Sequence, residues 1–452
     1  MTGFDPGELA AWTGGSWLGG LQPEGVAGFC FDTRQIQPGE CFIALTSGQR
    51  DGHDFVAQAL CEGASAALVE RELDLEIPQL VVSDTLLAME AIGSAVRCHF
   101  KGRVIGVTGS CGKTSTKEML RHLLGPDATH ATRGNWNNRI GVPMTLLGLH
   151  QSGKSAAVVE AGINQPGEMS HLGGMIQADL VVVTNIGPAH LEKLGSLQGV
   201  AREKSLLMEH ARENAGLILP ASAFRHEAFS RFADRAVVLA QDGETVEGKP
   251  RAILRYQTEA GEIRIEELFG ETAFTVASHS PGIRANAVLA LVAAHRSGIP
   301  AEQLKERLAA WNPGENRGLL VERDGRPCYL DCYNANPASM ADALSAFAIS
   351  VPRHEPRCYV LGAMRELGPD AVDLHTESVR GLKLRPGDIA CLVGPEEFRA
   401  AYRRGMESAP EQVHEAGSAA ELQSIVASFR GALFLKGSRS FALEQLLSEP
   451  PE

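Results

Sequence analysis

The stretch VIGVTGSCGKTSTKEML, residues 104–120, decides the fold expected for the middle of this chain. An apolar strand leads into a loop that contains Gly109 and Gly112, and a segment with apolar residues at helical spacing follows. A strand, a glycine-bearing loop and a helix in this order are typical of phosphate-binding loops. Lys113 supplies charge for the outer phosphates, and Thr114 supplies a hydroxyl for Mg²⁺.

One position departs from the usual pattern of such loops. Val107 stands where glycine is expected, so a chance glycine-rich turn is the alternative interpretation. The context favours phosphate binding, because continuous apolar strands with helical segments between them indicate a parallel sheet covered on both faces. These strands are expected at VIGVTG (104–109), AAVVEAG (156–162) and LVVVTNIG (180–187).

The whole chain is predicted to be an α/β protein of three domains, with this unit in the second. The domains are expected at 1–100, 101–312 and 313–452. The first domain is predicted to contain strands at 41–45 and 66–70 around a helix at 53–64. The second is predicted to have a helix at 284–298 before its boundary. The third repeats the strand–helix alternation, with strands expected at 328–334, 358–363, 388–394 and 432–438.

Composition limits the possible partners. The net charge of −13 argues against a general nucleic-acid or membrane-surface binder. The nine cysteines show no CxxC pair, which predicts reduced thiols and a cytoplasmic protein. No signal peptide and no membrane span are expected, because no apolar run approaches the ~18 residues that a span needs.

Two residues that follow strands in the middle domain are metal candidates. Glu160 ends one expected strand and His190 follows the next, and the carboxyl ends of parallel strands face one crevice. Both can therefore face a Mg²⁺–phosphate at the loop. A capping or solvated carboxylate is the alternative for Glu160 and a hydrogen-bonded loop histidine for His190, since Mg²⁺ prefers oxygen ligands.

Lys204 occupies an unusual position in the predicted helix SLQGVAREKSLLMEH (196–210). At about 100° per residue it shares one face with Leu197, Val200 and Leu207. It is either a lysine that extends its ammonium to solvent or an amine kept neutral by desolvation. A neutral amine can add carbon dioxide and become a carbamate, which binds metal as a carboxylate does.

The segment TRGNWNNRIGVPMTLL (132–147) is too polar for a core element. It is a solvated loop, or its amides and Arg139 contact a polar ligand above the phosphate site. The chain has no NKxD motif, so a guanine-reading GTPase is disfavoured.

These motifs together resemble the Mur ligase family. The resemblance is carried in order by GVTGSCGKTST, GNWNNRIGVP, VVEAGINQPGEM, TNIGPAHL, GVAREKSLL, DCYNANPASM, LGAMRELG and FLKGSR. The pair YNANP and LGxMxELG is the most specific. The phosphate loop of the family also lacks the first glycine, which removes the objection to Val107.

The resemblance implies a three-domain architecture with a phosphate-loop central domain and a Rossmann-like C-terminal domain. It implies an ATP-dependent ligase that phosphorylates a peptide carboxylate and then forms an amide, with two Mg²⁺ ions and a candidate lysine carbamate. The substrates implied by its most specific motifs are UDP-N-acetylmuramoyl-tripeptide and D-alanyl-D-alanine, and a monomer is expected. The third residue of the stem peptide is left open.

Site residues follow from the resemblance position by position. The residues expected to be catalytic are Lys113, His190 and Lys204. Those expected at ATP are Thr108, Gly109, Ser110, Cys111, Gly112, Lys113, Thr114, Ser115, Asn286, Arg317 and Asp331. Those expected at the metal are Thr114, Glu160, His190 and Lys204 as a carbamate. Those expected at the substrates are Thr33, Arg34, Asn135, Asn137, Asn138, Arg139, Tyr333, Asn334, Asn336, Lys436 and Arg439.

Three departures from the family pattern are present. Cys111 replaces the usual asparagine, Ala363 replaces an aspartate, and SPGIRAN (280–286) lacks a histidine–asparagine pair. The alternatives are a related amide ligase with another acid and amine, such as a folylpolyglutamate-type enzyme, or a non-catalytic nucleotide-binding relative.

Overall fold

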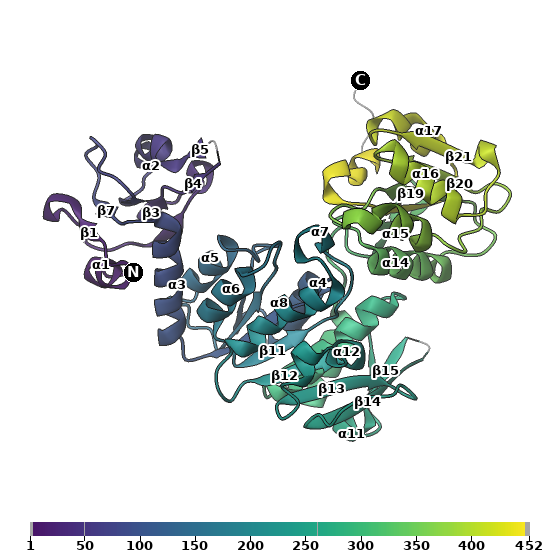
Figure 1. Ribbon diagram of the computed structural model, residues 1–452, viewed down its shortest axis with the longest axis horizontal. Helices are drawn as coiled ribbons and strands as arrows, with labels where there is room; N and C mark the ends of the chain where they lie inside the picture. The colour runs from purple at the N-terminus through teal and green to yellow at the C-terminus, as the bar shows by residue number, and fades with distance from the viewer. Residues whose placement is uncertain (1–2, 49, 260, 448–452) are drawn as a thin grey trace.

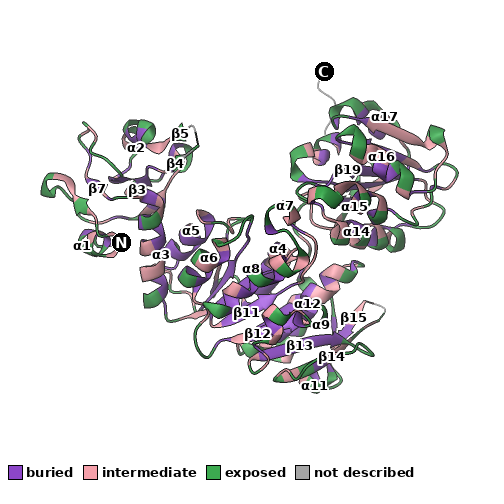
Figure 2. Ribbon diagram, in the orientation of Figure 1, coloured by how far each residue is buried: buried purple, intermediate pink, exposed green. Residues whose placement is uncertain are grey.

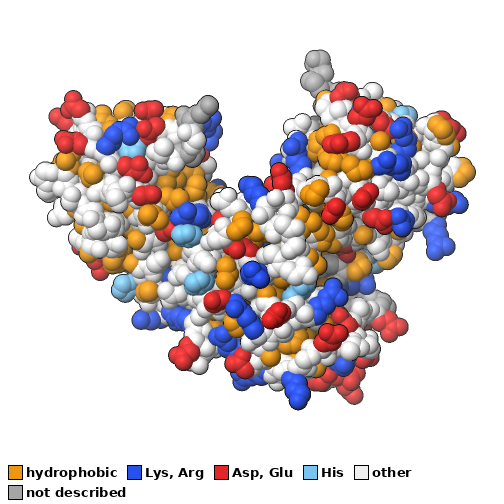
Figure 3. Space-filling view, in the orientation of Figure 1, with side chains coloured by type: hydrophobic (Ala, Val, Ile, Leu, Met, Phe, Trp, Pro, Cys, Tyr) orange, Lys and Arg blue, Asp and Glu red, His pale blue; other side chains and the backbone are white. Residues whose placement is uncertain are grey.

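In this computed structural model, residues 3–48, 50–259 and 261–447 are described. The first two residues of the expected first domain and the last five of the expected third domain therefore lie outside the described residues. The chain forms three α/β units arranged around a hollow, with the first and the third unit on either side of the central one (Figures 1 and 3). Each unit has its own sheet. Among the described residues, no helix has the length and apolar content to cross a bilayer.

The first unit is a five-stranded sheet in which four parallel strands are joined by one antiparallel edge strand. In sheet order the strands are β1 Ser16–Trp17, β7 Gln79–Val81, β6 Ala66–Val69, β3 Glu40–Ile43 and β2 Gly28–Cys30. A separate hairpin is formed by β4 Thr46–Ser47 and β5 Arg50–Asp51. The helices are α1 Pro6–Thr13, α2 Val56–Cys61 and α3 Thr85–His99.

The helix predicted over 53–64 is shorter and begins differently. Residues Gly52–Phe55 form a 3₁₀ turn, and α2 follows. Asp51 causes this start, because its carboxylate accepts hydrogen bonds from the backbone N–H of His53 at 3.0 Å and contacts its Nδ1 at 2.6 Å. A side-chain acceptor of this kind favours a turn over a regular helix start.

The central unit is a nine-stranded sheet whose parallel part confirms the sequence prediction. In sheet order its strands are β16 Ala273–Thr275, β15 Glu262–Arg264, β14 Ala252–Glu259, β13 Ala236–Gln241, β12 Gly216–Pro220, β11 Leu180–Val183, β8 Arg103–Thr108, β10 Ala156–Glu160 and β9 Thr129–Ala131. The antiparallel extension by β15 and β16 was not predicted, because each strand has only 3 residues and lacks the apolar run of the inner strands.

Helices cover both faces of the central sheet, as its fully buried strands β10 and β11 require (Figure 2). One face packs on α4 Lys113–Leu124, α12 Pro281–Arg296 and α13 Ala301–Ala310. The other packs on α5 Gly141–Leu147, α6 Glu168–Ile176 and α8 Leu197–Glu209. Short helices complete the unit at α7 Leu191–Leu194, α9 Ala221–Phe224, α10 Glu227–Ser230 and α11 Glu266–Phe269.

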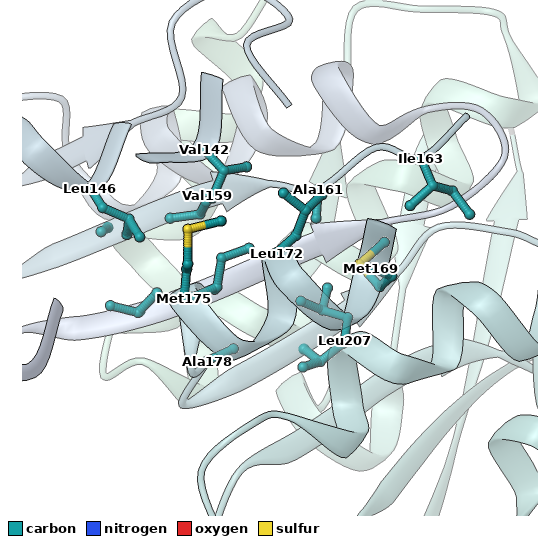
Figure 4. Close-up of a cluster of buried hydrophobic side chains, with 14 of the residues drawn as sticks. Val142, Leu146, Val159, Ala161, Ile163, Met169, Leu172, Met175, Ala178 and Leu207 are labelled. Atoms are coloured by element: carbon teal, nitrogen blue, oxygen red, sulfur yellow. The ribbon is translucent and has the colours of Figure 1, made fainter. Parts of the chain in front are cut away.

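The first and central units share one apolar core. Figure 4 shows part of it, where Val142 and Leu146 of α5 meet Val159 of β10, with Leu172 and Met175 of α6 beside them. The same cluster continues through α3 to the first sheet. Since burial of each such side chain contributes about 1.5–3 kcal/mol, this core joins the two units firmly.

The third unit is a six-stranded sheet with one antiparallel edge strand. In sheet order its strands are β17 Leu319–Arg323, β18 Arg326–Asp331, β22 Ala432–Lys436, β19 Arg357–Gly362, β20 Ile389–Val393 and β21 Val413–Ala416. Its helices are α14 Pro337–Ser350, α15 Ala371–Ser378, α16 Glu396–Gly405 and α17 Gln423–Ser428. All four strands predicted for this region are present, but each observed strand ends one to three residues before the end of its predicted stretch.

Candidate active site

The phosphate loop joins β8 to α4 and has the backbone that glycine permits. Gly109 has φ 149° and Gly112 has φ 77°, a left-handed conformation that costs other residues energy. Neighbouring side chains also exclude a Cβ, which would lie 1.9 Å from Thr184 Oγ1 at Gly109 and 2.7 Å from the Asn286 amide at Gly112. No side chain caps α4, so its first N–H groups are available to an anion.

A loop from β11 holds the phosphate loop in place. Asn185 Oδ1 accepts hydrogen bonds from the backbone N–H groups of Ser110 at 3.1 Å and Cys111 at 2.9 Å. Asn185 Nδ2 lies 2.6 Å from Cys111 Sγ, and Thr184 Oγ1 donates to the Cys111 carbonyl at 2.5 Å. The thiol at position 111 therefore has a partner in this loop, and burial raises its pKa.

Lys113 lies over its own loop, where its Nζ donates to the Gly109 carbonyl at 2.9 Å. Burial lowers the pKa of Lys113, and the negative charge of Glu160 opposes this shift. The ammonium is thus held at the phosphate loop, with only an uncharged oxygen as its hydrogen-bond acceptor.

Glu160, at the end of β10, has the geometry of a metal ligand. Its Oε1 accepts hydrogen bonds from Thr114 Oγ1 at 3.1 Å and from Asn137 Nδ2 at 2.7 Å. Its Oε2 is buried and has no hydrogen-bond partner among the described residues. A buried carboxylate oxygen without a partner is costly, and a cation would satisfy it.

The donor set suits Mg²⁺ bound together with phosphates. Across the described ranges, no three His, Cys, Asp or Glu side chains lie close enough together to hold a metal ion by themselves. Mg²⁺ commonly takes only one or two protein carboxylates and completes its shell with phosphates and water. Glu160 and the Thr114 hydroxyl provide such a partial set.

A buried lysine that was not predicted as a site residue anchors the polar segment that carries Asn137. Lys117 on α4 is fully buried and donates to the carbonyls of Thr132 at 2.8 Å and Gly134 at 3.1 Å. Thr132 in turn accepts from the backbone N–H of Glu160 at 2.9 Å. The signal in the sequence was a lysine on the apolar side of the expected helix.

Lys204 is buried on α8 and forms no hydrogen bond or ion pair with any described residue. Burial lowers the pKa of Lys204 well below its usual value, and the charge of Lys113 lowers it further. The structure therefore favours the desolvated amine over the lysine that reaches solvent.

His190 lies at the cleft, where its Nδ1 contacts a carboxylate of the third domain. Nδ1 is 2.5 Å from Glu366 Oε2, and both residues have left-handed backbones, with φ of 55° and 64°. Burial lowers the pKa of His190, while Glu366 opposes the shift. Glu366 was not predicted as a site residue, although it belongs to the quoted motif LGAMRELG.

The third domain lies across from the phosphate loop and forms the second wall of the site. Asp331, at the end of β18, pairs with Lys436 Nζ at 2.6 Å, and Lys436 also donates to the Asn334 carbonyl at 3.1 Å. Burial raises the pKa of Asp331 to about 6, although Lys436 opposes the shift. The guanidinium of Arg317 stacks 3.7 Å from the centre of the Tyr333 ring. These groups present cations and hydrogen-bond acceptors toward the phosphate loop.

The two walls enclose a cleft of about 930 Å³. Most of the predicted site residues line it, namely Ser110, Cys111, Gly112, Lys113, Thr114, Ser115, Asn135, Asn137, Glu160, His190, Asn286, Arg317, Asp331, Tyr333, Asn334, Asn336 and Lys436. Thr108, Gly109 and Lys204 are not among its lining residues. Thr108 donates to the Ala161 carbonyl at 2.9 Å beneath the loop.

Other predicted substrate residues lie elsewhere. Thr33 and Arg34 are in the first unit, where Arg34 donates twice to Asp32, at 2.8 and 2.7 Å, and lowers the pKa of Asp32 to about 2. Asn138 accepts from two backbone N–H groups at the start of α5. Arg139 donates to Glu90 of α3 at 2.7 Å.

Arg439 pairs with Glu444 and lines a second cleft, of about 530 Å³. That cleft includes Thr114 and Ser115 of the phosphate loop and Arg317 of the third domain.

Comparison with known proteins agrees with this geometry. Residues 107–294 match the model of the Mur ligase middle domain, and residues 316–439 match that of the Mur ligase glutamate ligase domain. The UDP-N-acetylmuramoyl-tripeptide–D-alanyl-D-alanine ligase of Escherichia coli (strain K12) is 32% identical over 431 residues, which covers 92% of each chain. The chain belongs to the Mur ligase family.

Further relatives also match this Mur ligase over almost its whole length. The UDP-N-acetylmuramoyl-tripeptide–D-alanyl-D-alanine ligase of Treponema pallidum (strain Nichols) is 31% identical and 93% of each chain is covered. A crystal structure of MurF from Acinetobacter baumannii matches this Mur ligase with a TM-score of 0.84 at 28% identity over 98% of each chain. MurF from Thermotoga maritima, in complex with ADP, matches in fold with a TM-score of 0.76 at 24% identity, over 93% of this chain and 96% of that one. The three-domain α/β architecture implied by the sequence motifs is confirmed.

Proposed function

We propose that this Mur ligase joins D-alanyl-D-alanine to UDP-N-acetylmuramoyl-tripeptide in an ATP-dependent, ADP-forming reaction of peptidoglycan precursor synthesis. The relatives of that name match the chain over more than nine-tenths of its length, which supports this substrate pair. The observation that carries the proposal is the single cleft in which Lys113, Thr114 and Glu160 face Asp331 and Lys436.

The chemistry needs both walls of this cleft. A carboxylate is a poor acyl donor, so the peptide carboxylate takes the γ-phosphoryl group of ATP and becomes an acyl phosphate. The amine of D-alanyl-D-alanine then attacks the acyl carbon, and phosphate leaves. Lys113 stabilises the negative charge that develops on the transferred group, and the free N–H groups of α4 orient the phosphates.

Glu160 and Thr114 hold Mg²⁺ in this proposal, and bound Mg²⁺ neutralises phosphate charge during transfer. Asn137 fixes the orientation of the carboxylate through its bond to Oε1. His190 and Lys204 as a carbamate hold a second ion. Asn286, Arg317 and Asp331 contact the nucleotide. The remaining predicted substrate residues bind the two substrates, with Thr33 and Arg34 at the uridine diphosphate. The enzyme acts as a cytoplasmic monomer.

An assay of ADP and phosphate release tests the reaction. Release is expected only when ATP, the UDP-linked tripeptide and D-alanyl-D-alanine are all present, and the pentapeptide product is identified by mass spectrometry. L-glutamate or a diamino acid in place of the dipeptide should give no product. Phosphate release that is unchanged without D-alanyl-D-alanine would contradict the proposal, and product with another amine would identify a related ligase.

Replacing Glu160 with glutamine tests the metal assignment. Because the variant keeps the shape but loses the charge at Oε2, the Mg²⁺ concentration for half-maximal ADP release should rise by about tenfold or more. Glu306→Gln is the matched control, since Glu306 is an exposed residue of α13 without a hydrogen bond or ion pair to any described residue. An unchanged Mg²⁺ requirement in Glu160→Gln would remove Glu160 from the metal site.

A further inference from the structure

The third domain is attached to the central domain without a shared apolar core. Its two buried clusters contain described residues of the third domain alone, whereas the first and central units share one cluster. Among the described residues, polar contacts cross this boundary at two places. One is the contact of His190 with Glu366, and the other is made by Asp342. The orientation of the third domain therefore depends strongly on polar contacts.

Asp342 on α14 accepts two short hydrogen bonds from the start of α12 in the central domain. Its Oδ2 accepts from Ser280 Oγ at 2.6 Å, and its Oδ1 accepts from the backbone N–H of Gly282 at 2.6 Å. Ser280 is also the N-cap of α12, because its Oγ accepts from the Ile283 N–H at 2.9 Å. A carboxylate at a helix N-terminus is stabilised by the N–H groups and by the helix dipole.

Glycine at position 282 gives the Asp342 carboxylate room at this contact. A Cβ there would lie 3.2 Å from the carboxylate atoms, so the carboxylate would have to shift by a few tenths of an ångström. At this contact α14 contributes the Asp342 carboxylate, and the start of α12 contributes the Ser280 hydroxyl and the Gly282 backbone N–H.

This contact connects the two walls of the ATP cleft. One turn beyond Gly282, α12 carries Asn286, whose amide lies against Gly112 of the phosphate loop. On the other side, α14 directly follows the loop that carries Tyr333 and Asn336. A movement of Asp342 relative to Gly282 therefore changes the separation of the two walls.

We propose that Asp342 is a positioning residue that holds the central and third domains in the arrangement that binds ATP. This inference rests on the proposed function only in taking ATP as the occupant of the cleft. When the contact is lost, the protein populates the binding arrangement less often, and the apparent dissociation constant rises in inverse proportion to that population.

Calorimetric titration with the ATP analogue AMP-PNP and Mg²⁺ tests this without requiring ligase turnover. Asp342→Ala should weaken binding by about tenfold, as expected for the loss of a charge-assisted contact. Asp342→Asn keeps an acceptor for the Gly282 N–H and should recover most of the affinity. Hydrogen exchange of the backbone amides of residues 282–284 should be faster in Asp342→Ala than in the wild-type protein.

Two further variants separate positioning from general stability. Gly282→Ala should also weaken AMP-PNP binding without lowering the melting temperature, because alanine favours the helix while its Cβ displaces the carboxylate. Asp373→Ala should leave binding unchanged, since Asp373 is an exposed carboxylate on α15 without a partner among the described residues. Unchanged or tighter binding in both Asp342→Ala and Gly282→Ala would overturn the proposal. If binding responds as expected but no ligase product forms, the proposed reaction fails and the positioning role stands.

Discussion

Lys113→Ala is expected to lower kcat for ADP release by about 10²–10³-fold, the range seen when one preorganised group that stabilises transition-state charge is removed. Lys113 is the lysine whose ammonium lies at the phosphate loop, bonded to a carbonyl rather than to a carboxylate. Its charge is therefore available to the transferred phosphoryl group. Initial rates of ADP release, measured at saturating concentrations of all substrates, give kcat directly.

Two comparisons make the result specific to Lys113. Lys305→Ala removes an exposed lysine of α13 that has no partner among the described residues, and it should leave kcat unchanged. The melting temperature of Lys113→Ala should stay close to that of the wild-type protein, because the lysine gains only one hydrogen bond and loses solvation on burial. A kcat within threefold (about 0.7 kcal/mol) of wild type would exclude Lys113 from the reaction.

Lys204→Ala is expected to lower turnover by about a hundredfold or more, and added bicarbonate should not restore it. The buried amine has no acceptor among the described residues, and burial lowers its pKa, which favours the neutral amine with its lone pair. That nitrogen can attack the carbon of CO₂ and release a proton, which gives a carbamate anion. Wild-type protein in ¹³C-bicarbonate should show a carbamate carbon signal that the alanine variant lacks.

Two other buried lysines serve as internal comparisons. Lys117 and Lys436 are as buried as Lys204, but each of these amines donates hydrogen bonds to two or more oxygens. Only one new carbamate signal is therefore expected, and it should disappear in Lys204→Ala alone. Near-normal turnover of the alanine variant would show that the carbamate idea is wrong.

Local sequence was sufficient for the elements that follow chain patterns. Apolar runs predicted β8, β10 and β11, and the glycines predicted the loop before α4. Predicted strands extended beyond the observed ends. In β11, for example, the sequence shows no break directly after Val183, but the strand ends there because Thr184 hydrogen-bonds to the phosphate loop. The ends of elements depend on neighbours that are distant in sequence, so they were least predictable.

The departures from the family pattern also required the structure. Cys111 is accommodated because Asn185 provides it with a partner. Ala363 is buried, and Gly394 lies so close that the two leave little room for a larger side chain, since a Cβ on Gly394 would be 2.8 Å from that of Ala363. Neither neighbour lies near its partner in the sequence, so no local pattern could have indicated the pairing.

The sequence by itself determined the chemical groups of the site, the alternation of strands and helices, and the family. These are properties of short segments, and motif spacing records them. The tertiary structure decided which groups meet. It pairs Glu160 with Thr114 and Asn137, brings Glu366 to His190, and sets Asp342 on the start of α12. Such contacts join residues that are 23 to 176 positions apart, and their geometry follows from how sheets and domains pack rather than from any local pattern.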